Sequence, residues 1–226
     1  MSVSAQPPIR TRRLAALPPD LLSQILPEFR PFTVTVRSAN PGCVVVIAAS
    51  AGGLDPLRHI IAALPVPCLA AVFVVMHIGP HPSVLPRLLR SCGGHPAIFG
   101  CDGALIEAGH IYVAPPDHHM SLETHRIRLN QGPKVHYTRP AADPLFISAA
   151  QSHGQRVMGI VLSGGSRDGA AGSRAIEKYG GMVLVQNPRE AEVPSMPSAA
   201  MMADHPEGCL LVGEISHRVN AFCSHG

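Results

Sequence analysis

The sequence predicts an α/β protein with a doubly wound, mostly parallel, Rossmann-like sheet and a small antiparallel excursion in its middle. Short continuous runs of apolar, mostly β-branched residues recur along the chain, which is typical of strands buried on both faces of a parallel sheet. Segments with helical periodicity alternate with these runs, and such alternation indicates helices on both faces. Apolar residues make up 46% of the 226 residues, aromatic residues only 4%, and there is no Trp, so the core is expected to be aliphatic.

The first half of the predicted sheet begins where a proline-rich segment ends. Val44 opens a β-branched run that we interpret as a strand, and the pair Gly52-Gly53 breaks the chain before a helix with leucine and isoleucine on one side. A second apolar run follows, and the helix after it has proline near its first turn. These expected elements are the strands 44–49 and 70–76 and the helices 54–64 and 82–91.

The middle of the chain lacks long apolar runs. Residues 110–114, 119–123 and 126–130 are short or alternate between apolar and polar side chains, and turn residues separate them. We therefore expect an antiparallel excursion there. Residues 131–142 are polar and contain proline, which predicts a loop.

The second half returns to the alternating pattern. Asp143 is expected to cap a helix over 143–152, with Pro144 at its first position. The pair Gly180-Gly181 is expected to close a later helix. The other expected elements are the strands 157–162, 182–186 and 209–212 and the helices 169–179 and 197–204.

Residues 1–42 differ from the rest in composition. They are rich in proline and basic, with five Arg (10, 12, 13, 30 and 37) against Asp20 and Glu28. We interpret them as an N-terminal extension or linker, partly flexible, before a single domain at 43–226. The formal net charge of the whole chain is +3, so this segment carries the entire excess. A neutral body with few aromatic residues argues against a nucleic-acid partner.

Composition also bears on the compartment. No apolar run approaches the 18 or more residues of a membrane span, and no apolar stretch follows the first arginines as in a secretory signal. Six Cys are present and none forms a C-x-x-C pair. We expect a cytoplasmic protein without membrane insertion, whose reduced thiols pack as small core residues.

Three polar residues follow three of the predicted buried strands. Ser50 follows the first strand, His77 the second, and Asp168 lies in the glycine-rich segment after the strand at 157–162. Because the carboxyl ends of parallel strands meet at one edge of the sheet, these side chains are expected to share that edge. A hydroxyl, an imidazole and a carboxylate are the inventory of acyl transfer: nucleophile, base, and the group that orients the base.

Each of these residues also has a purely structural interpretation. Ser50 and Asp168 both precede predicted helices, so either could serve as a helix cap. His77 could be a partly buried histidine at the end of a strand. Composition and spacing alone leave the catalytic and structural interpretations open.

Two other kinds of site are weaker hypotheses. The pairs Gly52-Gly53 and Gly164-Gly165 could cradle phosphate at helix starts, but neither G-x-G-x-x-G nor a P-loop with Lys is present. The histidine pairs 77/81 and 118/119 lack a Cys or acidic partner at ligand spacing, so no metal site is expected. The A-x-S-x-G around Ser50 also departs from the G-x-S-x-G of α/β-hydrolases.

Six ordered segments resemble the catalytic domain of the chemotaxis protein-glutamate methylesterases, the CheB family. The resemblance covers 44–212, nearly the whole body. The segment IAASAGG resembles the nucleophile segment I-G-A-S-[TA]-G-G, VVMHIGP resembles V-V-x-H-x-x-P, and LSGGSRDGAAG resembles L-[TS]-G-x-G-x-D-G-x-x-G. The stretches IYVAPP, RPAADPLF and the one from Gln186 to Pro197 match further segments in the same order.

The resemblance implies a function for the residues at the strand ends. It implies hydrolysis of γ-glutamyl methyl esters on the cytoplasmic helices of chemoreceptors, and deamidation of receptor glutamines through the same intermediate, without a metal or cofactor. Ser50 is then the nucleophile, His77 the base and acid, and Asp168 the orienting carboxylate. The backbone N–H groups of Ala51 and Gly165 are the expected oxyanion donors.

The chain departs from the family pattern at several positions. Ala48 stands where the family has Gly, and Gly165 and Ser166 alter the loop that carries Asp168. The altered loop keeps an alternative open: a degenerate member that binds receptor helices or a kinase without catalysis. Family members also carry an N-terminal receiver domain, for which 1–42 is too short, so we expect either constitutive activity or restraint by a separately supplied histidine kinase or regulator.

Overall fold

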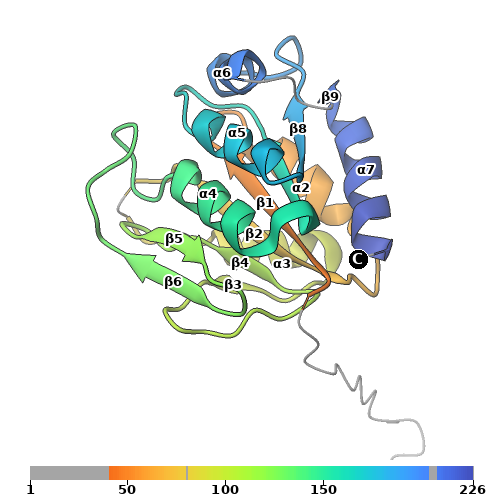
Figure 1. Ribbon diagram of the computed structural model, residues 1–226. Coiled ribbons are helices and arrows are strands. Elements are labelled where there is room, and N and C mark those ends of the chain that lie inside the picture. Colours follow the sequence, from red (N-terminus) through yellow and green to blue (C-terminus); the bar gives the residue numbers. More distant parts are fainter. Residues whose placement is uncertain (1–40, 80, 204–207, 226) are drawn as a thin grey trace, which may run out of the picture. The chain divides into compact units, whose positions relative to one another are not determined.

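A computed structural model describes residues 41–79, 81–203 and 208–225 and shows a seven-stranded sheet in the order β3-β4-β2-β1-β7-β8-β9 (Figure 1). All of its pairings are parallel. The strands are β1 (Cys43–Ala49), β2 (Ala70–Met76), β3 (Ala97–Phe99), β4 (Ile111–Val113), β7 (Val157–Val161), β8 (Met182–Gln186) and β9 (Gly208–Leu210). The predicted doubly wound α/β fold is therefore confirmed.

Helices cover both faces of this sheet, because successive strand residues point to opposite sides. In β1, Val45 and Ile47 belong to the core on one face, and Val44 and Val46 to the core on the other. The first face is covered by α2 (Leu54–Ala62), α3 (Leu85–Gly93) and α7 (Val212–His225). The second is covered by α4 (Ala142–His153), α5 (Ala170–Lys178) and α6 (Ser195–Ala203), and η1 (Gly154–Arg156) links α4 to β7.

The antiparallel excursion is smaller than expected. Only β5 (His119–Leu122) and β6 (Ile127–Asn130) pair antiparallel, as a separate two-stranded sheet. The prediction for 110–114 was wrong, because β4 lies parallel between β2 and β3 in the main sheet. Tyr112 of β4 stacks on Phe73 of β2 at 5.2 Å between ring centroids. Three-residue strands such as β3 and β4 are too short to show a period in sequence.

Other differences concern the ends of helices. The helix expected at 82–91 begins at Leu85, and the proline in its first turn is Pro86. Asp143 does not cap its own helix, since Ala141 is the N-cap residue of α4. The expected last strand ends at Leu210, and the chain continues into α7, which was not anticipated. The glycine pair after α5 behaves as expected: Gly180 has φ 81° and its N–H bonds to the carbonyl of Glu177 at 2.9 Å.

The extension at 1–42 falls almost wholly outside the described residues, so its role and the domain boundary stay predictions. The six cysteines are free thiols. Cys43, Cys68 and Cys223 are buried as expected, whereas the prediction was wrong for the exposed Cys101 and Cys209. Burial raises the pKa of Cys43 to about 11.

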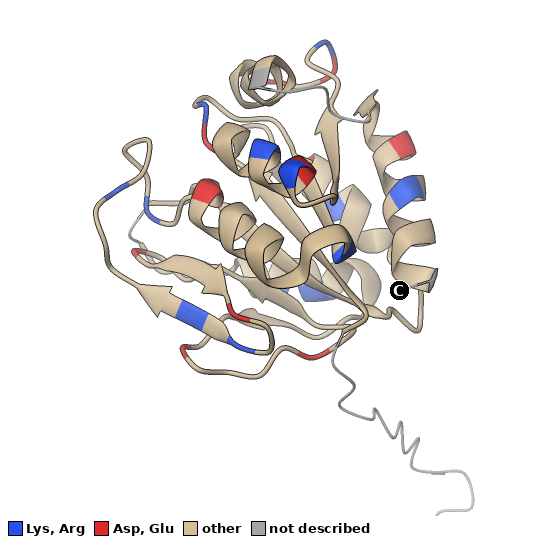
Figure 2. Ribbon diagram, viewed as in Figure 1, with Lys and Arg blue, Asp and Glu red and all other residues tan. Residues whose placement is uncertain are grey.

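Positions of charged residues are sparse and scattered over the described ribbon (Figure 2). None of the helices in the described part of the chain is both long and apolar enough to cross a membrane.

Acidification is expected to weaken the fold through His153 at the end of α4. Burial, followed by the positive Arg156 and by His125, lowers the pKa of His153 from 6.5 to about 4. The unfolded chain therefore binds a proton here between pH 6.5 and 4 that the folded protein does not. Stability is complete above pH 6.5 and should fall by about 1–2 kcal/mol towards pH 4, allowing for screening by solvent.

Urea unfolding of wild type and His153→Gln from pH 7 to 4 measures this effect. The variant should lose much of the pH slope, while His59→Gln, at an exposed position of α2, should keep it. Equal slopes for wild type and His153→Gln would contradict the assignment.

Candidate active site

The predicted site residues lie at the carboxyl edge of the sheet, where the strand order reverses around β1. β2 lies on one side of β1 and β7 on the other, so this edge is a topological switch point. The N–H of His77 donates to the carbonyl of Ala49 at 3.1 Å, and the N–H of Ser50 donates to that of Ser163 at 2.9 Å. Ser50 therefore lies between the residues that follow the two neighbouring strands.

His77 and Asp168 form a buried pair at this edge. The Nε2 atom of His77 lies 2.8 Å from Oδ2 of Asp168, and the two side chains are 9% and 0% exposed. Burial by itself would raise the pKa of Asp168. The hydrogen bonds from His77 and from the N–H groups of Ala142 and Asp143 outweigh burial, and the pKa lies below its ordinary value. Asp168 is therefore an ionised acceptor at neutral pH.

The starts of two helices hold the carboxylates of Asp168 and Asp143 in place. Asp168 accepts hydrogen bonds from the N–H groups of Ala142 and Asp143 (the latter at 3.0 Å), at the start of α4. Asp143 in turn accepts from the N–H groups of Gly169 at 3.0 Å and Gly172 at 2.7 Å, at the start of α5. Each aspartate thus caps the other's helix, which sequence spacing could not reveal because the partners are more than twenty residues apart.

The pair fixes which nitrogen of the imidazole is free. Since the ionised Asp168 can only accept, Nε2 of His77 must carry the proton that it donates. The neutral ring then presents Nδ1 as its basic nitrogen. Any proton taken from a nucleophile at this edge goes to Nδ1.

Ser50 does not cap the helix that follows it, which was the structural interpretation of its position. The N-cap of α2 is Gly53, which has no side-chain cap bond. Among the described residues, no hydrogen bond leaves the Ser50 hydroxyl, so its contact with His77 stays a prediction. Hydrogen bonds between catalytic groups are often long in the absence of substrate.

Ser163 organises the turn that carries Ser50, a role that sequence reasoning missed. Its buried hydroxyl donates to the carbonyl of Ala51 at 2.8 Å and accepts from the N–H of Val193 at 2.9 Å. Its own N–H donates to Oε1 of the buried Gln186 at 2.9 Å. The only signal in the sequence was its place in the glycine-rich segment before Asp168.

The two expected oxyanion donors lie in exposed turns of this edge. Among the described residues, neither the N–H of Ala51 nor that of Gly165 donates to a backbone acceptor outside the helices and strands. Both N–H groups are thus available to a ligand, and their role stays a prediction.

Gly164 is expected to be intolerant of a side chain. A Cβ there would lie 2.1 Å from Sδ of Met196 and 2.8 Å from Cβ of Ser50. Gly164→Ala should therefore displace Ser50 and destabilise the protein by about 1–3 kcal/mol in urea unfolding.

The neighbouring glycine supplies the control. A Cβ on Gly165 meets only Val193, at 3.8 Å, so Gly165→Ala should shift the unfolding free energy by no more than about 0.5 kcal/mol. Equal shifts for the two variants would refute the close packing at Gly164.

The phosphate interpretation of the glycine pairs has little support. The N–H of Gly53 donates to the carbonyl of Ser50 and that of Gly164 to the carbonyl of Val193, both at 2.9 Å. The Glu192 side chain also lies against Gly52, with Oε2 3.0 Å from where a Cβ would stand. A carboxylate there repels an anion.

One group of potential metal ligands occurs among the described residues. His136, Asp143 and Asp168 bring their ligand atoms within 4.8 Å of one another. These atoms are already engaged: His136 Nε2 bonds to Oδ2 of Asp143 at 3.0 Å, and Asp168 bonds to His77. The cluster is explained by these bonds and carries no separate argument for a metal.

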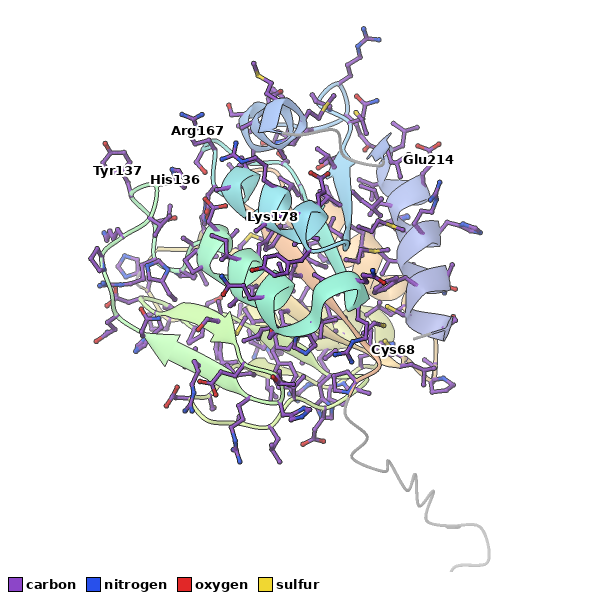
Figure 3. The ribbon with its side chains drawn as sticks, in the orientation of Figure 1. Cys68, His136, Tyr137, Arg167, Lys178 and Glu214 are labelled. Atoms are coloured by element: carbon purple, nitrogen blue, oxygen red, sulfur yellow. The ribbon has the colours of Figure 1, made fainter. Side chains whose placement is uncertain are left out.

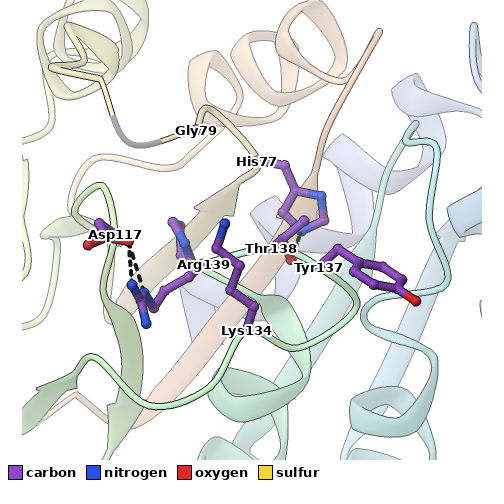
Figure 4. A pocket seen from close by; sticks show the side chains of 8 residues that line it. His77, Gly79, Asp117, Lys134, Tyr137, Thr138 and Arg139 are labelled. Atoms are coloured by element: carbon purple, nitrogen blue, oxygen red, sulfur yellow. Dashed lines mark hydrogen bonds and ion pairs between the residues drawn. The ribbon is translucent and has the colours of Figure 1, made fainter.

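A pocket of about 130 Å³ adjoins His77 (Figure 4). The loop between β6 and α4 forms one wall, where Arg139 binds Oδ1 of Asp117 through Nε at 2.9 Å and Nη2 at 2.7 Å. From the same loop, Oγ1 of Thr138 lies 3.5 Å from Nε2 of His77. The loop predicted at 131–142 is thus part of the site, which sequence reasoning had not foreseen.

The parallel sheet and the polar residues at its switch point place this chain among α/β proteins that carry a hydroxyl, an imidazole and a carboxylate at one edge. A family model described as CheB methylesterase matches residues 45–219. The chain belongs to the CheB methylesterase family.

The relatives include curated proteins and a solved structure. A protein-glutamate methylesterase/protein-glutamine glutaminase 2 of Caulobacter vibrioides is 37% identical over 183 residues, which cover 78% of this chain and 53% of that protein. A protein-glutamate methylesterase/protein-glutamine glutaminase of Pyrococcus horikoshii is 38% identical over 172 residues, with 74% and 47% covered. The chain therefore spans about half the length of these two relatives.

The structural comparison agrees. The crystal structure of the Thermotoga maritima CheB methylesterase catalytic domain matches with a TM-score of 0.77 at 28% identity, and the match covers 80% of this chain and 98% of that one.

Proposed function

We propose that this protein hydrolyses γ-glutamyl methyl esters with Ser50, His77 and Asp168 as its catalytic residues. The observation that carries the proposal is the buried His77–Asp168 pair, whose Nδ1 has no hydrogen bond within the described part of the chain, at the edge where Ser50 ends the neighbouring strand. Membership in the CheB methylesterase family supports the choice of substrate bond.

The proposed reaction starts with proton transfer. Nδ1 of His77 takes the proton of the Ser50 hydroxyl as its oxygen attacks the ester carbonyl, and Asp168 stabilises the resulting imidazolium. The N–H groups of Ala51 and Gly165 donate to the oxyanion. The proton on Nδ1 then passes to the departing methoxide, which leaves as methanol.

Water completes the cycle. His77 deprotonates a water molecule that attacks the acyl-enzyme, and Ser50 recovers its proton as the γ-carboxylate of the receptor's glutamyl residue is released. A glutamine side chain passes through a tetrahedral intermediate of the same kind to the same acyl-enzyme, with ammonia as its leaving group, so deamidation belongs to the proposed activity.

The proposed substrates are glutamyl methyl esters on the cytoplasmic helices of chemoreceptors, which places the protein in the cytoplasm. The family and the names of the relatives support this class of bond, since they describe protein-glutamate methylesterases. A histidine kinase or a separate regulator is the further partner that we propose.

Methanol release from a methylated receptor fragment tests the activity, and a fluorophosphonate probe tests the nucleophile. The folded wild-type protein should release methanol, and the probe should label Ser50, as read by mass spectrometry of its peptide. The altered loop at 165–167 favours one rival, a non-catalytic module that binds receptor helices. If the folded protein neither releases methanol nor is labelled by the probe, that rival is supported and the esterase is rejected.

A further inference from the structure

The loop beside His77 contains a strained turn at 135–138. Val135 and Thr138 exchange two backbone hydrogen bonds, of 3.1 and 2.9 Å, across His136 and Tyr137. The φ angles of these two central residues are 49° and 64°. Two positive values define a type I′ turn, which Gly and Asn favour and which a bulky residue such as tyrosine rarely adopts. Such an outlier at a site is a reason to ask what the strained residue does.

The surroundings hold this turn in one conformation. Nε2 of His136 bonds to Oδ2 of the buried Asp143 at 3.0 Å, and Oγ1 of Thr138 donates to the carbonyl of Val135 at 2.9 Å. Nη1 of Arg139 donates to the carbonyls of Gln131 and Gly132 at 2.9 and 2.8 Å. These bonds hold the backbone of the turn in place. Tyr137 directly precedes Thr138, and the side chain of Thr138 contacts the imidazole of His77.

The turn exposes the aromatic side chain of Tyr137 to solvent. Tyr137 is 96% exposed, the highest value among the exposed large hydrophobic residues described. Figure 3 shows Tyr137 and His136 at the same edge of the molecule as Arg167, and Figure 4 shows the Tyr137 ring directed away from the Asp117–Arg139 pair. A rigid, exposed aromatic ring gives contact area to a partner at little cost in conformational entropy.

Two cations accompany this ring. Lys134 lines the pocket beside His77, and Arg167 immediately precedes Asp168. The Arg139 guanidinium, with smaller contributions from His118 and Lys134, holds the pKa of Asp117 below its ordinary value. Lys134, Arg139 and Asp117 therefore leave one net positive charge beside His77, and Arg167 adds a second. Arg139 binds Asp117 through two nitrogens, and the Glu192 side chain lies against Gly52.

We infer that Tyr137, Lys134 and Arg167 form a docking rim for an acidic helix that carries the reacting methyl ester. This inference rests on the proposed function and names how its substrate is held. Residues three and four positions apart share one face of a helix. In this arrangement the glutamyl ester of the helix enters the site beside His77. Carboxylates three and four residues away on the same face of the helix then meet Lys134 and Arg167, and the CH₂ groups of these glutamate side chains pack on Tyr137.

Peptide binding to the 226-residue chain tests the docking rim. The protein carries Ser50→Ala to stop turnover, and the probe is a fluorescein-labelled helical peptide with one γ-glutamyl methyl ester flanked by Glu at positions three and four residues away. Fluorescence anisotropy gives Kd. Adding Tyr137→Ala should raise Kd about tenfold, and Lys134→Ala or Arg167→Ala about three- to fivefold at low salt.

Each rim variant has a matched control of the same residue type, and these controls lie on α5 or directly after it. These are Tyr179→Ala, Lys178→Ala and Arg174→Ala, all at exposed positions, and each should leave Kd within twofold. The effects of the two cations should vanish in about 0.5 M salt, and with a peptide whose flanking Glu residues are Gln. Circular dichroism of every variant checks that it is folded.

The outcomes separate this inference from the proposed function. No peptide binding, or equal Kd values for the rim and control variants, would overturn the docking rim even if wild type releases methanol. Binding that depends on the three rim residues, together with no methanol release by wild type, would keep the docking rim and reject the esterase.

Discussion

Ser50→Ala should abolish methanol release, with turnover falling about 10⁶-fold towards the uncatalysed rate. The variant removes the only atom that the proposed mechanism uses to form the acyl-enzyme. The fold should be unaffected, because the hydroxyl caps no helix and donates no hydrogen bond among the described residues. Steady-state methanol release and urea unfolding measure the two expectations, the second of which is a shift within about 0.5 kcal/mol.

A second serine controls for the loss of a hydroxyl as such. Ser91 is exposed on α3 and donates to the carbonyl of Leu88 at 2.7 Å, so Ser91→Ala should keep full turnover. Methanol release by Ser50→Ala at the wild-type rate would end the proposed mechanism.

The Asp168→Asn variant should lose about 10⁴-fold in kcat and also lose stability. An asparagine amide has a single acceptor oxygen, so it cannot replace both Oδ1, which accepts from Asp143 and Gly169, and Oδ2, which accepts from Ala142 and His77. If the NH₂ group faces His77, Nε2 must become the acceptor and Nδ1 then carries the proton. The imidazole is in the wrong tautomer for a base, which is the origin of the large kinetic loss. The disturbed buried hydrogen bonds should cost about 2–4 kcal/mol in unfolding free energy.

Asp143→Asn separates the two consequences. Asp143 makes a similar set of buried bonds, to Gly169, Gly172 and His136, but does not touch His77. It should lose a similar amount of stability and no more than about tenfold in kcat, because the His77 tautomer is kept. Equal kinetic losses in the two variants would show that Asp168 acts only as a helix cap. Rates for both are compared at a temperature where unfolding curves show them folded.

The sheet could be read from the sequence because its central strands are continuous apolar runs. β1 and β2 are seven residues long and buried at every residue, and the five residues of β7 are buried as well. The short strands β3 and β4 could not be found this way, because three residues that pair within a large sheet take their conformation from their neighbours. The helix α7 was missed because its first residue, Val212, continues the apolar residues of β9 without a turn signal.

The candidate residues Ser50, His77 and Asp168 were likewise set by sequence, since a residue that ends a buried parallel strand lies at a known edge of the sheet. Only the tertiary structure decided how they are held: that Asp168 is fixed by the start of α4, that Nδ1 of His77 is the free nitrogen, and that Tyr137 stands on a strained turn beside it. These facts depend on backbone N–H groups and loop conformations brought together from distant parts of the chain. Local patterns encode which strand a residue ends, whereas the hydrogen bonds that orient it are made only when the layers pack.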